Sequence, residues 1–365
     1  MSLNESDVLS AMSKVMDPEL HQDLVKLGMV KDIRITGNQV KFKIELTTPA
    51  CPLKGKIQAD SEAALKGAGI NDFDIEWGAR VRSAPAGMAN KDGMLPGVKN
   101  VILVGAGKGG VGKSTVSVNL AVALARCGAK VGLLDADFYG PSIPLMTGIT
   151  KKPVSRDGKK LDVLEAHGIS VMSIGFLVEA DQALIWRGPM LHGALTQLLR
   201  DVNWGELDYL VLDLPPGTGD VALTISQQLR AAGAVLVTTP QDVALADVVR
   251  AKQMFDKVSI PVLGIIENMS QFICPHCNQT TEIFDHGGGK RAGELMGITF
   301  LGEIPLQLRI RQGGDNGVPV VLGHPDSQEA KAFMEIAKTL AGRISQENSR
   351  VPLQVIQAAP HSHQG

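Results

Sequence analysis

Residues 107–114 read GKGGVGKS, and this stretch decides the fold. It matches the pattern G-x-x-x-x-G-K-[ST], in which glycines let backbone N–H groups curl around a phosphate at the start of a helix. The flanking sequence fits, because the apolar run VILVGA precedes it and the helical pattern STVSVNLAVALARCG follows it. The stretch therefore predicts a strand, a phosphate-binding loop and a helix.

Short apolar runs alternate with helical patterns on the carboxyl-terminal side of this loop. The runs are rich in Val, Leu and Ile without polar alternation, which is typical of parallel strands buried on both faces. They are KVGLLDAD, ISVMSIG, YLVLDLP, AVLVTTP and PVLGIIENMS. The pattern predicts an α/β P-loop NTPase domain over residues 99–343, with a doubly wound, mostly parallel sheet.

The first part of the chain has a different pattern. Apolar and polar residues alternate in QVKFKIEL (39–46), as in a half-buried strand of a hairpin. A helical stretch and a further strand, DFDIEWGARV, follow. We expect a small α+β domain over residues 1–82, a linker rich in Pro, Gly and Ala over 83–98, and a disordered tail over 344–365.

Composition and charge narrow the classes of function. The chain has 365 residues and a net charge of −2, with no run of basic residues that would predict binding to nucleic acid or to a membrane. The amino terminus lacks the features of a signal peptide, and no stretch has the length of a membrane span. Four cysteines without a disulfide-type spacing indicate a reducing compartment. We therefore expect a cytoplasmic protein.

The phosphate loop assigns roles to several side chains. Lys113 is expected to reach the β- and γ-phosphates of ATP, and Ser114 to bind Mg²⁺. Asp213 ends the apolar run YLVLDLP, which suits a carboxylate that contacts Mg²⁺ through water. Asp135 and Asp137 follow another strand, and spacing alone does not show which of them orients the attacking water. The expected nucleotide-binding loop comprises Gly107, Lys108, Gly109, Gly110, Val111, Gly112, Lys113, Ser114 and Thr115.

A second lysine makes the motif more specific. With Lys108, the loop reads KGGVGKS and resembles the deviant Walker A group, which includes MinD, ParA and the nitrogenase iron protein. The resemblance implies a nucleotide-sandwich homodimer in which Lys108 reaches the phosphates bound by the partner subunit. It also implies that Asp137 positions the water, that Asp135 acts with Mg²⁺, and that Asn268 contacts the adenine edge.

Cys274 and Cys277 form a C-x-x-C motif just after the run PVLGIIENMS. A redox-active motif of this kind normally opens a helix, whereas the residues that follow, NQTTEIF, have an extended pattern. A zinc site needs four ligands, and the nearby candidates are His276 and His286. In a two-fold dimer, two copies of the motif supply four thiolates, which suits a [4Fe–4S] cluster. Ligand type alone leaves zinc and iron–sulfur open.

Taken in order, the motifs resemble the Mrp/ApbC-type iron–sulfur cluster carrier ATPases. They are GKGGVGKST, DADFYGPS, LDLPPGTGD, VTTPQDVALADV, ENMS with C-x-x-C close behind, and FLGEIPL, and they span residues 100 to about 325. The resemblance implies a slow ATP hydrolase that carries a labile [4Fe–4S] cluster, held by Cys274 and Cys277 at a homodimer interface. Its partners would be apo iron–sulfur proteins and cluster donors.

The small domain also resembles a known type. Its segments MDPEL and TTPACPL are similar to those of the iron–sulfur-assembly domain that is fused to many Mrp proteins. The resemblance makes Cys51 a possible functional thiol, although a lone cysteine is more often a small buried side chain.

Two other classes of protein share parts of the pattern. A zinc-stabilised positioning ATPase of the MinD/ParA type would need an amphipathic membrane helix or a basic DNA-binding face, and the tail provides neither. An electron-transfer reductase like the nitrogenase iron protein uses single, well-separated cysteines in place of C-x-x-C. The carrier is therefore the leading hypothesis, and the positioning ATPase is the alternative.

Overall fold

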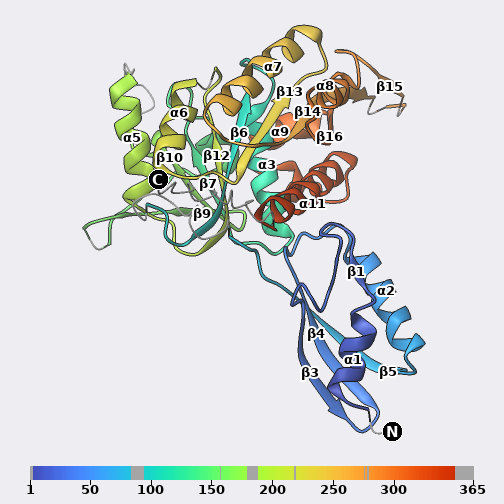
Figure 1. Ribbon diagram of the computed structural model, residues 1–365. Helices are drawn as coiled ribbons and strands as arrows, with labels where there is room; N and C mark the ends of the chain where they lie inside the picture. The colour runs from blue at the N-terminus through green and yellow to red at the C-terminus, as the bar shows by residue number, and fades with distance from the viewer. Residues whose placement is uncertain are drawn as a thin grey trace, which may run out of the picture.

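A computed structural model describes residues 3–83, 94–156, 158–178, 188–217, 219–274, 276–277 and 279–349. Most of the expected linker, 83–98, falls outside the described residues. The chain forms two hydrophobic cores, a smaller one within the first part and a larger one built mostly by the residues after the linker, with Ala50 and Val81 of the first part added to it. Figure 1 shows the smaller unit extending away from the larger one.

A large, mostly parallel sheet forms the centre of the larger unit. All of its strand pairs run parallel except those of the short edge strands β9 and β15. Its strands lie in the order β15 (Thr280–Thr281), β14 (Val262–Ile273), β13 (Gly233–Thr238), β6 (Val98–Ala106), β12 (Leu207–Asp213), β7 (Val131–Asp135), β10 (Ile169–Ser173) and β9 (Leu164–Ala166), with β16 (Phe300–Leu306) paired to β14. The predicted doubly wound sheet is confirmed.

Helices cover both faces of this sheet (Figure 1). From β6 the chain moves along the sheet toward β7, whereas from β12 it moves in the opposite direction, toward β13 and β14. Because both crossovers are right-handed, α3 lies on one face of the sheet and α6 and α7 lie on the opposite face. The helices are α3 (Lys113–Arg126), α4 (Ile143–Thr147), α5 (Gly188–Arg200), α6 (Gly219–Gln228), α7 (Asp242–Lys257), α8 (Gly288–Met296), α9 (Leu308–Asp315), α10 (Val320–Gly323) and α11 (Gln328–Ser349). The direction of winding reverses at β6, where ligands bind in open α/β sheets.

The smaller unit is the predicted α+β domain. Helices α1 (Glu5–Met12) and α2 (Lys54–Gly67) pack on a sheet in which β3 (Val30–Thr36) and β5 (Asp72–Ala79) flank β4 (Gln39–Leu46). The alternation read from QVKFKIEL is present, because every second residue of β4 is buried. Short strand pairs join Met16–Asp17 (β1) to Gln22–Asp23 (β2) and Leu161–Asp162 (β8) to Val202–Asn203 (β11).

The two units meet through buried polar contacts. The Thr48 hydroxyl lies 3.2 Å from the Tyr209 hydroxyl, and Ser345 donates a 2.7 Å hydrogen bond to Thr47. Asn348 donates to the carbonyl oxygen of Arg82 at 2.9 Å. The segment TTPACPL therefore lies at this interface, against β12 and α11.

The expected disordered tail does not begin at residue 344, because α11 extends into this segment. The helix continues through Ser349, and Ile344 and Ser345 are buried. Residues 344–349 are therefore structured, because their apolar and hydroxyl side chains contact the smaller unit and the core. The rest of the expected tail, 350–365, falls outside the described residues. None of the described helices combines the length and the apolar character needed to cross a bilayer.

We expect Tyr209→Phe to lower the free energy of unfolding by about 1 kcal/mol, because it removes a buried hydrogen bond between the units. The Tyr209 side chain is 1% exposed, and burial raises its pKa to about 12, so the hydroxyl is neutral. Urea denaturation of Tyr209→Phe, Thr48→Val and the double variant measures the coupling. Additive effects of the two substitutions would contradict a contact between these hydroxyls.

Candidate functional site

The phosphate loop joins β6 to α3 and is shaped by close packing. A Cβ atom on Gly107 would lie 2.4 Å from the main chain of Asp247, so α7 requires a glycine here. Gly112 has a φ of 80° and is the N-cap residue directly before α3, and a Cβ atom there would lie 2.3 Å from the Asn268 amide nitrogen. Gly109 and Gly110 are exposed, so the loop presents its backbone to solvent at the amino terminus of a helix. This geometry can bind a phosphate.

Lys113 is the centre of a buried charged cluster. Its side chain is 7% exposed, and Nζ lies 2.8 Å from Asp213 and 3.8 Å from Asp137. Ser114 donates a 2.6 Å hydrogen bond to Asp213. Sequence reasoning missed Ser117, which donates a 2.7 Å hydrogen bond to the same carboxylate from the next turn of α3. The structure thus brings together the predicted lysine, hydroxyl and carboxylate.

Asp135 and Asp213 are neighbours in register at the ends of β7 and β12. Burial raises the pKa of Asp135 to about 8, with a further rise caused by the charge of Asp213. Ser173, also missed by sequence reasoning, donates a 2.9 Å hydrogen bond to Asp135. Burial likewise raises the pKa of Asp137, although the Lys113 ammonium opposes this rise. Asp137 thus lies 3.8 Å from Lys113 of the phosphate loop, and Asp135 lies beside Asp213.

Lys108 and Asn268 differ in how they are held. Lys108 is half-buried and, among the described residues, has no carboxylate within ion-pair distance. Asn268 is 5% exposed and donates a 2.8 Å hydrogen bond to the carbonyl oxygen of Val111. Asn268 thus ties β14 to the phosphate loop, and its expected contact with adenine stays a prediction.

The C-x-x-C motif lies in the turn between β14 and β15. Strand β14 ends at Ile273, and β15 returns antiparallel with Thr280 opposite Ile273. The Cys274 amide donates a 2.9 Å hydrogen bond to the carbonyl oxygen of Gln279, which closes the turn. The motif therefore does not open a helix, in agreement with the extended pattern read from the sequence.

The environment of the motif favours a thiolate. Hydrogen bonds from the backbone N–H groups of His276 and Cys277 lower the pKa of Cys274, and the Cys277 side chain lowers it further. Cys277 is exposed. Since the thiolate is the form that binds metals, this turn is ready to ligate a soft metal centre.

The described residues of one chain do not complete a four-ligand site at this motif. In the parts of the chain described above, one group of at least three His, Cys, Asp or Glu side chains converges, and it contains neither Cys274 nor Cys277. The candidate zinc ligand His286 instead lies 2.8 Å from Glu303.

Cys51 and Cys127 lie in less reactive surroundings. Cys51 packs against the small core, and burial raises its pKa to about 11, so the thiol is protonated. Cys127 follows α3, packs against the large core, and also has a pKa raised by burial. The possible functional role of Cys51 stays a prediction.

Comparison with known families decides the classification. The family described as the NUBPL iron-transfer P-loop NTPase matches residues 97–341. The chain belongs to this iron-transfer P-loop NTPase family. The family described as iron-sulfur cluster assembly protein matches residues 5–76, which lie in the small domain. The resemblance to the carrier ATPases read from the motifs is therefore confirmed.

Related proteins agree with this classification. An iron-sulfur cluster carrier protein of Deinococcus radiodurans is 53% identical over 342 residues, covering 93% of this chain and 95% of that protein. A nucleotide-binding protein from Archaeoglobus fulgidus, solved in complex with ADP and with Co, is 40% identical with a TM-score of 0.57, covering 66% of this chain and 94% of that one. MinD from Pyrococcus furiosus shares the fold, with a TM-score of 0.50 and 24% sequence identity. The match covers 66% of this chain and 97% of MinD.

Proposed function

We propose that the protein is an ATP-dependent carrier that holds a labile [4Fe–4S] cluster at a homodimer interface and transfers it to apo-proteins. The observation that carries this proposal is that, within the described residues of one chain, Cys274 and Cys277 have no further metal ligands beside them. A two-fold axis would bring a second pair of thiols to the first, which gives the usual four ligands of such a cluster. The name of the Deinococcus relative supports a carrier function.

The nucleotide site supports slow ATP hydrolysis. Lys113 would leave its ion pairs with Asp213 and Asp137 to contact the β- and γ-phosphates. Asp137 would orient the attacking water, with Asp135 beside it, and Asn268 would contact the adenine edge from its place against Val111. The hydroxyl of Ser114 and the carboxylate of Asp213, 2.6 Å apart, are ligands of the type that Mg²⁺ prefers. When bound, Mg²⁺ would neutralise phosphate charge.

Hydrolysis would change the geometry of the dimer and so the exposure of the cluster. Cysteine ligands that come from two chains separate when the dimer interface opens. Four ligands from a single chain would stay together and would retain the cluster. We assign the small domain, 1–82, to the recruitment of cluster donors or apo-proteins, and the ATPase domain, 99–343, to nucleotide and cluster binding in the cytoplasm. Cys51 would act as a thiol only if its packing against the small core loosened, because it is half-buried there.

Anaerobic reconstitution with iron and sulfide tests the proposal. We expect a dimer with about two irons per chain and a broad visible absorbance, since one cluster would be shared by two chains. Incubation with an apo [4Fe–4S] dehydratase should then restore its activity, at a rate that depends on ATP. Stoichiometric zinc without visible absorbance, in a protein that restores no activity, would instead support the zinc-stabilised positioning ATPase.

We expect Lys108→Ala to reduce ATP hydrolysis, because Lys108 would act on the nucleotide of the partner subunit. Its half-exposed side chain, without a carboxylate partner among the described residues, is available for this contact. Co-expression of Lys108→Ala with Lys113→Ala should restore activity to about one quarter of the wild-type rate, because half of randomly assembled dimers are mixed and each has one intact site.

Two controls bear on this experiment. Lys151→Ala alters an exposed lysine outside the loop and should leave the rate unchanged. If the co-expressed pair hydrolyses ATP no faster than the two variants measured separately, Lys108 acts within its own chain and the sandwich dimer is wrong.

A further inference from the structure

Two glutamates lie opposite each other on the neighbouring strands β14 and β16. Glu267 of β14 is the register partner of Glu303 of β16, and these strands run parallel. Register partners project to the same face of a sheet, where like charges directly opposite each other are destabilising. The two carboxylates therefore need positive charge or hydrogen-bond donors nearby.

Glu267 is fully buried, with 0% of its surface exposed. Its two oxygens accept hydrogen bonds from the amides of Gly287, at 3.0 Å, and Gly289, at 2.6 Å, where α8 begins. A carboxylate oxygen has lone pairs left after accepting one hydrogen bond, so Glu267 can still bind a cation. The turn before α8 contains Asp285, which has a left-handed backbone conformation with a φ of 74°. The residue that follows it in the turn contacts Glu303.

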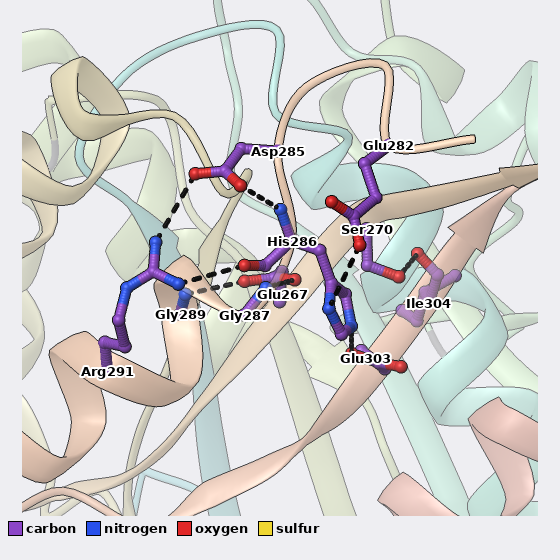
Figure 2. A network of polar contacts seen from close by, with 10 residues as sticks. All are labelled: Glu267, Ser270, Glu282, Asp285, His286, Gly287, Gly289, Arg291, Glu303 and Ile304. Carbon is purple, nitrogen blue, oxygen red and sulfur yellow. Dashed lines mark hydrogen bonds and ion pairs between the residues drawn. The ribbon is translucent and has the colours of Figure 1, made fainter. Parts of the chain in front are cut away.

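That next residue is His286. Its Nε2 atom lies 2.8 Å from Glu303, and its Nδ1 atom lies 3.8 Å from Glu282. Figure 2 shows the imidazole ring between these two carboxylates, with Glu267 beside it. One ligand atom each from Glu267, His286 and Glu303 lies within 4.8 Å of the other two. The histidine and Glu303 are 33% and 42% exposed, which leaves a path for an ion to enter.

We propose that Glu267, His286 and Glu303 form a binding site for a divalent transition metal such as Fe²⁺ or Mn²⁺. Two carboxylates and one imidazole are a mixed oxygen and nitrogen ligand set, which suits these ions better than the thiolates of the C-x-x-C turn do. The metal takes the Nε2 lone pair and the facing carboxylate oxygens, and water completes its coordination.

The second ring nitrogen strengthens the assignment. A histidine that binds a metal through one nitrogen usually has a carboxylate or carbonyl near the other, which fixes the ring and raises its basicity. Glu282 is the carboxylate on this side of the ring, 3.8 Å from Nδ1, a distance of an ion pair and longer than a hydrogen bond. The cation also offsets the repulsion between the paired glutamates. This site is separate from the ligands of the cluster and does not depend on the proposed carrier function.

Titration with Mn²⁺, followed by the loss of the electron paramagnetic resonance signal of the free ion, tests this site. The full-length chain is used without nucleotide, with Cys274 and Cys277 replaced by serine, and His361 and His363 by alanine, so that these other ligands are removed. His286→Gln and Glu303→Gln should each abolish one bound Mn²⁺ per chain. Glu282→Gln should weaken binding about 10-fold, because Glu282 supports the histidine without touching the metal.

Glu294→Gln is the matched control, since Glu294 is exposed on α8 and lies outside the cluster. It should bind Mn²⁺ as the parent chain does. Retained ATP binding shows that each variant is folded. If folded His286→Gln and Glu303→Gln chains bind as much Mn²⁺ as the parent with the same affinity, the site does not exist. Equal weakening by Glu294→Gln would also overturn it, because general surface charge would then explain the binding.

Discussion

Lys113→Ala should reduce ATP hydrolysis about 100- to 1,000-fold, the loss typical of removing one group that stabilises transition-state charge. Lys113 begins α3, is 7% exposed, and already lies among carboxylates that surround the phosphate site. Without its ammonium group, the charge that develops on the transferred phosphate would lose one of its positive partners and still lie close to Asp213 and Asp137. A phosphate-release assay at saturating ATP measures the effect.

Because Lys113 is buried against two carboxylates, its removal can also disturb the fold. Lys113→Gln provides a second variant, since its amide can still donate a hydrogen bond to Asp213 but has no charge. We expect the same loss of hydrolysis with normal circular dichroism. Lys130→Ala changes an exposed lysine after α3 and serves as the control. Wild-type hydrolysis by Lys113→Gln would remove the argument for the phosphate loop.

Cys274→Ser and Cys277→Ser should each remove the cluster, with iron falling from about two per chain to background. A serine hydroxyl is a poor ligand for iron in a cluster because it is a harder and less acidic donor than a thiol. Backbone hydrogen bonds lower the pKa of Cys274, and Cys277 is exposed, so both thiols are available in the turn. Iron analysis and visible absorbance after reconstitution measure the loss.

The matched controls are the remaining cysteines. Cys51→Ser and Cys127→Ser should retain the cluster, since burial keeps both thiols protonated. ATP hydrolysis should be largely unchanged in all four variants, because none of these residues lies in the phosphate loop. A monomer with about four irons per chain would contradict a shared cluster, and so would a Cys274/Cys277 double variant that still binds one.

The sequence predicts those parts of the site whose residues lie within a motif or at the end of a recognisable strand. The loop 107–114 lies between a strand and a helix, and Asp213 ends the next strand in the sheet, so their meeting follows from the topology. Ser117 and Ser173 were missed because hydroxyl groups inside apolar patterns give no signal of their own. Their partners, Asp213 and Asp135, lie far away in sequence.

Contacts between distant segments account for the other differences. The sequence ISQENS (344–349) has mostly polar residues and predicts the start of a tail, but Ser345 and Asn348 contact the small domain. The meeting of Glu267, His286 and Glu303 also depends on the pairing of β14 with β16, and no motif in the sequence indicates it. Such contacts become visible only when the strand order is known.

Strand β14 connects the nucleotide site to the cysteine motif. It carries Asn268, which touches the phosphate loop, and it ends immediately before Cys274, about 20 Å further along at the usual rise per residue. Between them, Met269 has a φ of 59°, and the pairing with β16 shifts register before Phe272. Removing a single residue from this segment would direct Cys274 and Cys277 to the opposite face of the sheet, while the phosphate loop would stay in place. The number of residues between Asn268 and Cys274 should therefore tolerate change less than their identity does.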